Sequence, residues 1–173
     1  MTLTVDQLRE VLHYDPVSGN FTWLRRPSYR QEWNTRYAGV IAGGPTKTND
    51  GKIYWIISVN GQPIYAHRLA WLYMTGEWPA ALVDHRDTDS LNNRWINLRE
   101  ANNSQNAANS KLNKNNTSGF KGVCLNKETG RFQSYITIEN RMHHLGYHDT
   151  AEAAHAAYMQ AAIALHGDFA RGI

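Results

Sequence analysis

The chain has 173 residues, of which 42% are hydrophobic, and its 18 Lys and Arg against 15 Asp and Glu give a net charge of +3 with His neutral. This length holds one ordinary domain or two small ones, and no stretch approaches the roughly 18 uninterrupted apolar residues of a membrane helix. The single cysteine, Cys124, excludes an internal disulfide and a four-thiolate zinc site. The N-terminal residues include Asp6 and Glu10 and no apolar signal core, so we expect a cytoplasmic protein.

The N-terminal segment predicts a helix, a strand and an exposed basic loop. Thr4 and Gln7 form a capping pattern ahead of apolar residues at helical spacing, which favours a short amphipathic helix that ends near Tyr14. Residues 21–23 are typical of a short strand. Residues 25–36 carry four arginines against one glutamate, with aromatic side chains between them and no regular period, so we expect an exposed loop.

The middle of the chain predicts a hairpin, two helices and two short strands. Asn60-Gly61 is the dipeptide that best fits a tight two-residue hairpin turn, and β-branched and aromatic residues precede it. Gly76 follows apolar residues at helical spacing, as expected at the end of a helix. The expected hairpin strands are residues 53–59 and 62–66, the helices are residues 67–75 and 102–109, and the short strands are residues 81–84 and the segment around Trp95 and Ile96.

The C-terminal part predicts a linker and then a small sheet covered by one helix. Residues 110–118 lack apolar periodicity and carry lysines, which indicates a domain boundary and a linker that could track DNA. Thr150 can cap an Ala-rich helix with an inward stripe that runs to Leu165. The expected strands are residues 120–125, 131–138 and 141–147, with a turn at Glu139-Asn140 before the last. The expected domains are residues 1–109 and 119–173.

The stretch from Val83 to Asn106 carries the residues with the clearest chemistry. Asp84-His85 ends an apolar strand, a polar loop returns to Asn97, and a helix carries Asn106. A strand pair followed by a helix can bring Asp84, His85 and Asn106 around one divalent cation, and hard oxygen ligands suit Mg²⁺ or Mn²⁺. Phosphodiester hydrolysis needs such a metal and a base of near-neutral pKa. Taken singly, an Asp-His pair is more often a surface hydrogen-bonding dipeptide, so the hypothesis depends on the spacing.

That spacing resembles the HNH nucleases, specifically the histidine-asparagine-asparagine form of phage and intron homing endonucleases. The D-H pair, the N-N loop, the N-L-R segment and the final helical asparagine occur in this order within V-D-H-R-D-T-D-S-L-N-N-R-W-I-N-L-R-E-A-N-N-S-Q-N. The resemblance implies that Asp84 and Asn106 hold one Mg²⁺ or Mn²⁺ ion per active site. It also implies that His85 is the general base and that Asn97 braces the loop and orients His85.

The resemblance covers residues 15–109 and implies an α+β protein that begins with a ββα-metal (HNH) nuclease domain. His67 and Arg68 lie in the part of the pattern that precedes the Asp-His pair. A structural hydrogen bond and a surface charge explain these two residues as well as direct DNA contact does, so both interpretations stay open.

The arginine loop is a candidate DNA surface. A charge run is usually only a solvated face, but next to a nuclease core DNA contact becomes the favoured interpretation. Arg25, Arg26 and Arg30 could grip phosphates. Tyr29 and Trp33 could stack on sugars or bases.

Residues 119–158 carry a second resemblance. The segments G-F-K-G-V, G-R-F-Q-S-Y-I and H-H-L-G-Y-H-D-T-A-E-A-A-H-A-A-Y resemble the APETALA-two (ethylene-response-factor) DNA-binding domain. This implies a three-stranded sheet with one face in the major groove and a helix packed behind it. The implied DNA contacts are Lys121, Arg131 and Arg141, with Cys124, Asn126, Tyr135 and Thr137 where that family often carries arginine or other polar readers. The expected core residues are Phe120, Val123, Phe132, Ile136 and Leu145. The histidines without a recognised zinc-ligand spacing are His143, His144, His148 and His155.

Together these patterns predict a metal-dependent, site-selective DNA endonuclease of the homing type, encoded by a phage or intron and acting on double-stranded DNA in a bacterial host. One active site cuts one strand, so we expect a monomer to nick DNA and a double-strand break to need a dimer or two successive events. The alternatives are a non-catalytic, sequence-specific DNA-binding regulator on a nuclease scaffold and a general nuclease of RNA or DNA. The complete set Asp84, His85, Asn97 and Asn106 disfavours the regulator, and a dedicated reading domain disfavours the general nuclease.

Overall fold

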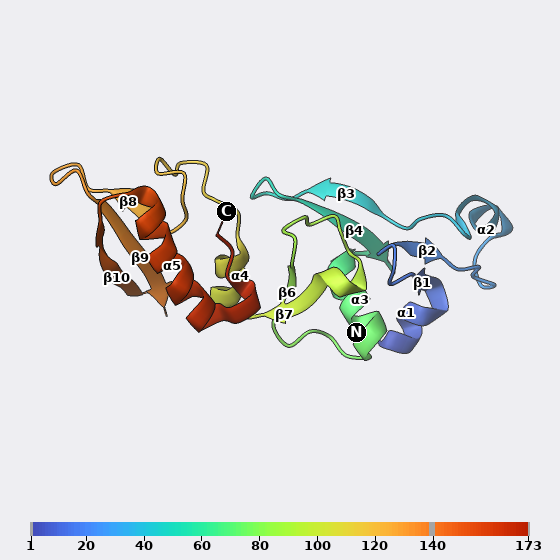
Figure 1. The fold of residues 1–173 in the computed structure, drawn as a ribbon. Coiled ribbons are helices and arrows are strands. Elements are labelled where there is room, and N and C mark those ends of the chain that lie inside the picture. The colour runs from blue at the N-terminus through green and yellow to red at the C-terminus, as the bar shows by residue number, and fades with distance from the viewer. Residues whose placement is uncertain (1, 139–140, 173) are drawn as a thin grey trace. The chain divides into compact units, whose positions relative to one another are not determined.

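The structure is a computed structural model that describes residues 2–138 and 141–172, so the expected turn at Glu139-Asn140 lies outside the described residues. Packing divides the chain into two compact units, residues 1–100 and 101–173. Each unit combines small sheets with helices (Figure 1), which confirms the predicted α+β class. The division falls before the segment 110–118, where the sequence predicts a linker, because the helix before that segment and the sheet after it belong to the same unit.

The described residues of the first unit form three small sheets. Strands β1 and β2 form a hairpin, β3, β4 and β5 form a three-stranded sheet, and β6 pairs with β7. The elements are α1 (Val5–Val11), β1 (Leu12–Tyr14), β2 (Phe21–Trp23), α2 (Gln31–Tyr37), β3 (Gly44–Lys47), β4 (Ile53–Val59), β5 (Gln62–Tyr65), α3 (Ala66–Thr75), β6 (Leu82–His85), the 3₁₀ helix η1 (Trp95–Asn97) and β7 (Leu98–Ala101), whose last residue falls across the division.

The local signals in this unit act as the sequence predicts. Thr4 and Gln7 form a reciprocal capping box at the start of α1, which satisfies two backbone donors that the first turn leaves unpaired. Asn60 and Gly61 have φ values of 52° and 79°, as a tight hairpin turn between β4 and β5 requires. Gly76 ends α3 with a φ of 86°. The predicted capping box, the hairpin turn and the end of the helix at Gly76 are therefore confirmed.

One hydrophobic core joins the N-terminal elements to α3 and β6. Leu8, Leu12 and Leu69 are fully buried, and the rings of Tyr14 and Phe21 are 1% exposed. The two rings lie 4.7 Å apart between centroids, a separation typical of stabilising aromatic pairs. The N-terminal hairpin is therefore built into the same core that supports β6.

Three predictions for this unit are wrong. The first helix ends at Val11 and not near Tyr14, because Leu12–Tyr14 form strand β1, which pairs with β2. Residues 25–36 are not all loop, since α2 begins at Gln31. Its Trp33 packs against Trp23, with 5.6 Å between the ring centroids. A helix held by aromatic contacts of this kind shows no helical period of apolar residues in the sequence. The expected strand around Trp95 and Ile96 is the 3₁₀ helix η1, and the strand begins at Leu98. Trp95 is drawn inward by Trp71, 5.3 Å away between centroids, while Ile96 is 84% exposed.

The second unit is a three-stranded antiparallel sheet with a long helix packed across it (Figure 1). The sheet order is β10-β9-β8. Its elements are α4 (Asn103–Asn109), β8 (Val123–Leu125), β9 (Phe132–Ile138), β10 (Arg141–His148), α5 (Ala151–His166) and the 3₁₀ helix η2 (Gly167–Phe169).

The core of the second unit is small. Ala154, Tyr158 and Ala162 of α5 are buried at helical spacing, and Ile136 of β9 is 5% exposed against them. Leu165, which the sequence places inward, is 46% exposed, one turn beyond the last buried position. Of the expected core residues, Val123 and Ile136 are buried, whereas the half-buried ones are Phe120, Phe132 and Leu145.

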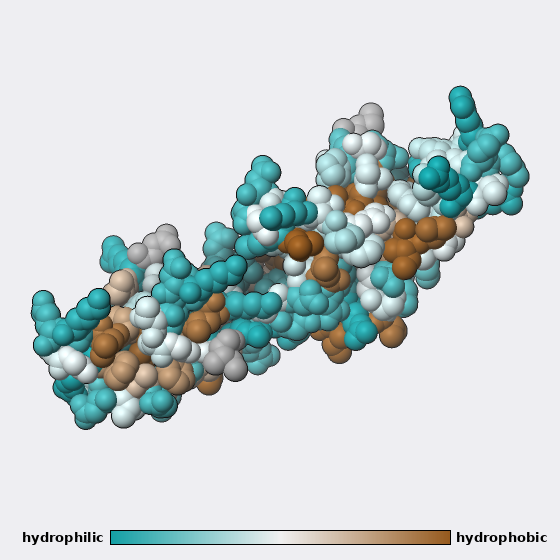
Figure 2. All heavy atoms as spheres, turned by 90° about the horizontal axis from the view of Figure 1, so that it is seen from above, coloured by the Kyte–Doolittle hydropathy of each residue, from teal (hydrophilic) through white to brown (hydrophobic). Residues whose placement is uncertain are grey.

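The surface offers no extended apolar layer on the face in view. Figure 2 shows hydrophilic side chains over most of that face, with hydrophobic ones in separate patches. The most exposed large hydrophobic residues are Ile96 at 84% and Val17 at 79%, and scattered residues of this kind are normal on globular proteins. No helix within the described ranges is long and apolar enough to cross a membrane.

Gly122 offers a test of the packing of α5 on the sheet. A Cβ atom at Gly122 would lie 2.1 Å from the ring of Tyr158, whereas at Gly119, also with a positive φ, it would meet nothing within 4 Å. We expect Gly119→Ala to destabilise the second unit by about 1 kcal/mol through its backbone conformation alone. Gly122→Ala should cost roughly 3 kcal/mol or more, because the ring must move.

The measurement is urea unfolding followed by amide NMR signals of β8, β9 and β10. All six tryptophans lie within residues 1–100, so tryptophan fluorescence follows the first unit separately. Equal losses of stability in the two variants would show that Tyr158 does not pack on Gly122.

Candidate active site

Asp84 and His85 end strand β6 in the interior of the first unit. Each of the two residues is 6% exposed, and Val83 before them is 9% exposed. A polar loop and the short η1 helix then lead to β7, which pairs with β6. Buried polar groups cost free energy unless they are hydrogen-bonded, so the partners of these two side chains define what the site can do.

Asp84 is paired with Arg99 of β7. The guanidinium Nε lies 2.9 Å from the carboxylate Oδ2, and the two side chains are 8% and 7% exposed. Removing one partner of such a buried pair leaves an uncompensated charge and typically costs about 3–5 kcal/mol. Arg99 therefore fixes the orientation of the Asp84 carboxylate across the strand pair.

Asn97 locks the loop that joins β6 to η1. Its Nδ2 donates to Oδ1 of Asp87 at 2.9 Å and to the carbonyl of Asn92 at 2.8 Å. Its Oδ1 accepts from the Asp87 amide at 3.1 Å, and its own carbonyl accepts from the Arg86 amide at 2.9 Å. One buried amide thus ties together both ends of the loop. That Asn97 also orients His85 for catalysis stays a prediction from the resemblance.

His85 is held by Asn93, which lies in the same loop. His85 Nε2 is 3.2 Å from Asn93 Oδ1, and Asn93 is 4% exposed. Burial lowers the pKa of His85 below its ordinary value of 6.5, and the contact with Asn93 and the nearby aspartates offset this only in part. The imidazole is therefore neutral at neutral pH, the form that can accept a proton.

His67 forms the wall of the site beside His85. The two rings lie 5.0 Å apart between centroids in an edge-on arrangement, and His67 stacks on Tyr65 at 5.4 Å. His67 is 8% exposed and its Nδ1 has no hydrogen-bond partner among the described residues. Burial, with smaller effects from His85 and Arg68, lowers the pKa of His67 to about 3. This buried, neutral residue faces the site rather than solvent, while the Arg68 guanidinium lies 5.8 Å from the ring centroid of Trp78.

Asn106 lies in α4, in the second unit, and its side chain is exposed. α4 begins with a capping box formed by Asn102 and Gln105, which confirms the helix predicted over this Asn-rich stretch. The structure thus brings Asp84, His85 and Asn97 together in one unit, and the role of Asn106 stays a prediction from the sequence.

Comparison with known proteins supports the same segment. A profile of the HNH endonuclease family matches residues 64–108. The chain is also similar to Protein 3.8 of Escherichia phage T7, with 35% identity over 106 residues that make up 61% of this chain and 87% of the phage protein. The chain belongs to the family of T7 Protein 3.8. Within it, residues 64–108 are an HNH endonuclease domain. No solved structure matches the chain.

The donors of the HNH site fit a loosely held hard cation rather than a closed metal cage. No group of three or more His, Cys, Asp or Glu side chains that could hold a metal ion occurs within residues 2–138 and 141–172. Asp84 supplies one oriented carboxylate in a buried setting. Mg²⁺ and similar ions are commonly bound through one or two carboxylates, with water and substrate phosphate as the other ligands, so these residues fit such an ion.

The arginine-rich segment before and within α2 is ordered by its own aromatic side chains. The Arg26 guanidinium lies 3.7 Å from the ring centroid of Tyr29 and 5.5 Å from that of Trp33. Asn34 bonds the backbone of Arg26 through both Oδ1, at 2.7 Å, and Nδ2, at 2.9 Å. The aromatic rings predicted to stack on DNA therefore pack on one another and on Arg26, and they hold the segment in one shape.

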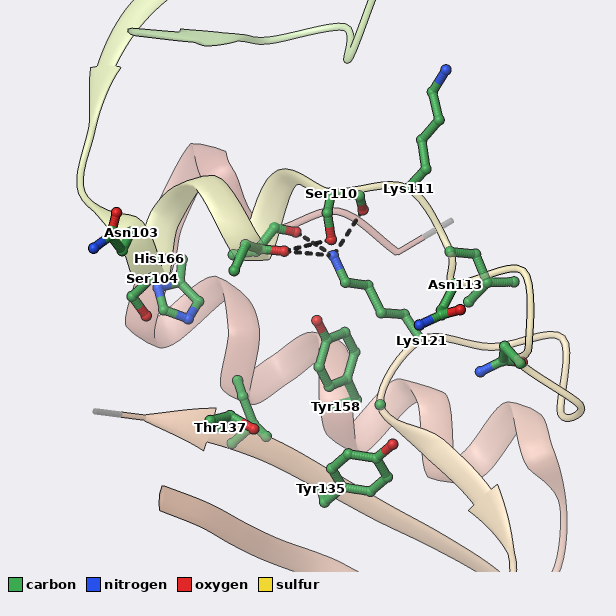
Figure 3. Close-up of a pocket in the computed structure, with 16 residues that line it drawn as sticks. Asn103, Ser104, Ser110, Lys111, Asn113, Lys121, Tyr135, Thr137, Tyr158 and His166 are labelled. Carbon is green, nitrogen blue, oxygen red and sulfur yellow. Dashed lines mark hydrogen bonds between the residues drawn. The ribbon is translucent and has the colours of Figure 1, made fainter. Parts of the chain in front are cut away.

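Lys121 in the second unit has a structural role. Its Nζ donates to the carbonyls of Ala107, Ala108 and Ser110 at 3.3, 2.5 and 2.9 Å, at the end of α4 (Figure 3). Burial, and then the charge of Arg171, lowers its pKa to about 8. Lys121 lines a pocket of about 540 Å³, whose lining side chains are drawn in Figure 3. An ammonium with three protein acceptors is not a ready phosphate contact, so Lys121 is a weak candidate for binding DNA.

The other predicted contacts of this unit differ in their surroundings. Arg131 is bound to Asp149, with 3.1 Å between Nε and Oδ1, and also donates to the carbonyl of Tyr147. Arg141 begins β10 and is exposed. Paired positions of antiparallel strands share a face of the sheet. By this register, the face that carries Tyr135 and Thr137 has no lysine or arginine among the described residues of its strands.

Two residues of the site were not singled out from the sequence. Asn93 contacts His85 directly, and Arg99 orients Asp84. The N-N loop and the N-L-R segment contain both, but a sequence pattern does not show which of two adjacent asparagines turns inward. Burial separates them, since Asn93 is buried and Asn92 is partly exposed.

The buried His67 predicts a loss of stability in acid. Its folded pKa of about 3 lies below the ordinary 6.5, so protons bind the unfolded chain first and stability falls as pH drops from 6.5 towards 3. At pH 5 this amounts to about 2 kcal/mol. His67→Phe should remove this part of the pH dependence, because the ring does not titrate.

The pH dependence of the free energy of unfolding is measured by urea unfolding at pH 7.5 and at pH 5, followed by tryptophan fluorescence. The stability difference between the two pH values should be about 2 kcal/mol smaller in His67→Phe than in the wild type. An unchanged difference would show that His67 is not kept neutral by the fold.

Proposed function

We propose that the chain is a metal-dependent DNA endonuclease in which His85 is the general base. This proposal rests on the surroundings of His85. Its imidazole is buried and neutral, contacts Asn93, and directly precedes the loop that Asn97 holds by hydrogen bonds. The HNH endonuclease domain at residues 64–108 supports a nuclease that acts on DNA. The family membership alone does not name a catalytic residue, and the geometry of His85 supports that role for it.

In the proposed reaction the neutral His85 takes a proton from a water molecule. The water oxygen forms a bond to phosphorus, and the bond from phosphorus to the 3′ oxygen breaks. The leaving 3′ oxygen takes a proton from solvent, and His85 returns its proton to solvent. The products carry 5′-phosphate and 3′-hydroxyl ends. Asn93 orients the imidazole and Asn97 keeps the loop from shifting during the reaction, which matters because small displacements of a base are costly.

The proposed metal site consists of Asp84 and Asn106, with Mg²⁺ or Mn²⁺ as the ion. When bound, the ion would stabilise negative charge on the phosphate and on the leaving oxygen. Arg99 holds the Asp84 carboxylate in one orientation for this role. One ion and one His85 serve one strand, so the proposed primary product is a nick.

The proposed substrate is double-stranded DNA, held by the arginines of the α2 segment. No salt bridge engages Arg25, Arg26 or Arg30 in the part of the chain that the structure describes. In the second unit, Arg141 and the sheet face with Tyr135 and Thr137 stay candidates for contact with DNA, as the APETALA-two resemblance implies. Since the similar Protein 3.8 is a phage protein, we propose that this chain is phage-encoded and acts on DNA in a bacterial host. The homing type stays a prediction from the resemblance.

A second candidate is a DNA-binding regulator without catalysis. The observation that favours it is the buried Asp84–Arg99 pair, because the guanidinium already contacts Oδ2 of the carboxylate that a metal ion would use. The two candidates differ in one measurable respect, because only the endonuclease converts supercoiled plasmid in the presence of a divalent ion.

We expect His85→Ala to lower the rate of plasmid cleavage by roughly 10²–10⁴-fold, the usual contribution of a general base. Its affinity for DNA should stay unchanged. The assay follows conversion of supercoiled plasmid to open circles with Mg²⁺, with Mn²⁺ and with EDTA, next to a gel-shift titration. His13→Ala is the matched control, because His13 is exposed on β1. Wild-type cleavage retained by His85→Ala would remove His85 as the base, and wild-type binding without cleavage in either metal would establish the regulator.

The proposed phosphate contacts of Arg25, Arg26 and Arg30 predict how DNA binding depends on salt. The double variant Arg25→Ala with Arg30→Ala should reduce the slope of log affinity against log salt by about 2, since each phosphate contact contributes about 0.9. Lys52→Ala is the control, because Lys52 is already paired with Asp50 at 3.7 Å and its loss should leave the slope nearly unchanged. Equal slopes for the wild type and the double variant would exclude these contacts.

A further inference from the structure

The loop that holds His85 is itself held by the N-terminal hairpin, 79 residues away in sequence. The hydroxyl of Tyr14, the last residue of β1, donates to the backbone carbonyl of Asn93 at 2.6 Å, and this bond is buried. Two residues further along each segment, the amide of Trp95 donates to the carbonyl of Pro16 at 3.0 Å. Two hydrogen bonds therefore fasten residues 93–95 to the turn between β1 and β2.

Gly19 allows this close approach. Its φ is +78°, and a Cβ atom there would lie 2.5 Å from the backbone N of Arg94 and from the carbonyl carbon of Asn93. Asp15 shapes the turn, since its carboxylate accepts from the amides of Val17 and Ser18. The backbone of the turn thus lies directly against the backbone of the loop that contains Asn93. Only glycine fits at position 19.

Asn93 carries the constraint onward to His85. Its carbonyl is held by Tyr14, its Nδ2 donates to the carbonyl of Leu91 at 3.2 Å, and its Oδ1 lies 3.2 Å from His85 Nε2. Because backbone and side chain are both fixed, a shift of the Asn93 backbone must move the atom that orients the imidazole. Burial raises the pKa of Tyr14, so its hydroxyl remains a donor over the whole working pH range.

We propose that Tyr14, Pro16 and Gly19, here called the N-terminal clamp, are positioning residues of the active site that set the orientation of His85 through Asn93. All three lie outside residues 64–108, the range of the HNH endonuclease domain, so the domain as matched by its family is incomplete as a catalyst. The catalytic consequence rests on the proposed function of His85, whereas the effect on the imidazole does not.

The test compares Tyr14→Phe with Tyr73→Phe in the full chain. Tyr14→Phe removes only the hydroxyl and keeps the ring that packs on Phe21. Tyr73 is the matched control, because its ring lies in the same aromatic cluster, 5.8 Å from Tyr14 and 6.2 Å from Phe21. Rates are compared at a temperature where circular dichroism shows both variants folded.

Two readouts distinguish positioning from general destabilisation. Tyr14→Phe should lower kcat for plasmid nicking by roughly 10-fold with KM for DNA unchanged, and it should shift the side-chain ¹⁵N resonances of His85 in NMR spectra recorded without metal. Tyr73→Phe should change neither quantity. Gly19→Ala, where it folds, should reproduce or exceed the effect of Tyr14→Phe.

Wild-type kcat in Tyr14→Phe, or a lower kcat with unchanged His85 resonances, would overturn the N-terminal clamp. If the wild type cleaves no DNA, the proposed function fails, and the NMR comparison alone decides the proposal: shifted His85 resonances in Tyr14→Phe support it and unchanged ones refute it.

Discussion

The structure of the site depends on one buried side chain, the amide of Asn97, which ties both ends of the loop between β6 and η1. A loop of this length would otherwise sample many conformations, because ordering each backbone residue costs about 1–2 kcal/mol. Asn97, itself buried, offsets that cost with partly buried hydrogen bonds to Asp87 and to the Asn92 carbonyl. His85 precedes the loop and Asn93 lies inside it, so the contact between them can form only when the loop is closed.

Closing the loop requires polar groups to be buried, and the rest of the first unit makes that burial tolerable. Asp84 and Arg99 neutralise each other across β6 and β7. The backbone of Asn93 finds its partner in Tyr14, whose ring is anchored in the hydrophobic core. A buried network is stabilising only when its members are satisfied. The N-terminal hairpin supplies one donor, the Tyr14 hydroxyl, and one acceptor, the Pro16 carbonyl, to groups of the loop. The long-range contacts explain why a short sequence motif needs the surrounding unit.

The sequence predicts those features that arise from local chemistry and misses those that arise from packing. The capping box at Thr4 and the turn at Asn60-Gly61 act within a few residues, so their signals are readable and both elements are found. The helix α2 has no such signal, because it is held by Trp33 against Trp23. The sequence also does not identify Asn93 as the partner of His85, since a loop rich in asparagine offers several side chains of the same chemistry.

The same distinction separates the charges that can meet DNA from those that the fold already uses. The resemblance implies three cationic contacts in the second unit. Lys121 and Arg131 are engaged with carbonyls and with Asp149, whereas Arg141 is exposed at the start of β10. In the first unit, Arg26 packs on the ring of Tyr29, and no salt bridge engages Arg25, Arg26 or Arg30 among the described residues. Phosphate attraction should therefore come mainly from the first unit, and the nearly uncharged sheet face of the second unit suits contact with bases or DNA shape. Under the proposed function, salt would weaken binding by the nuclease unit while leaving any base preference of the second unit in place.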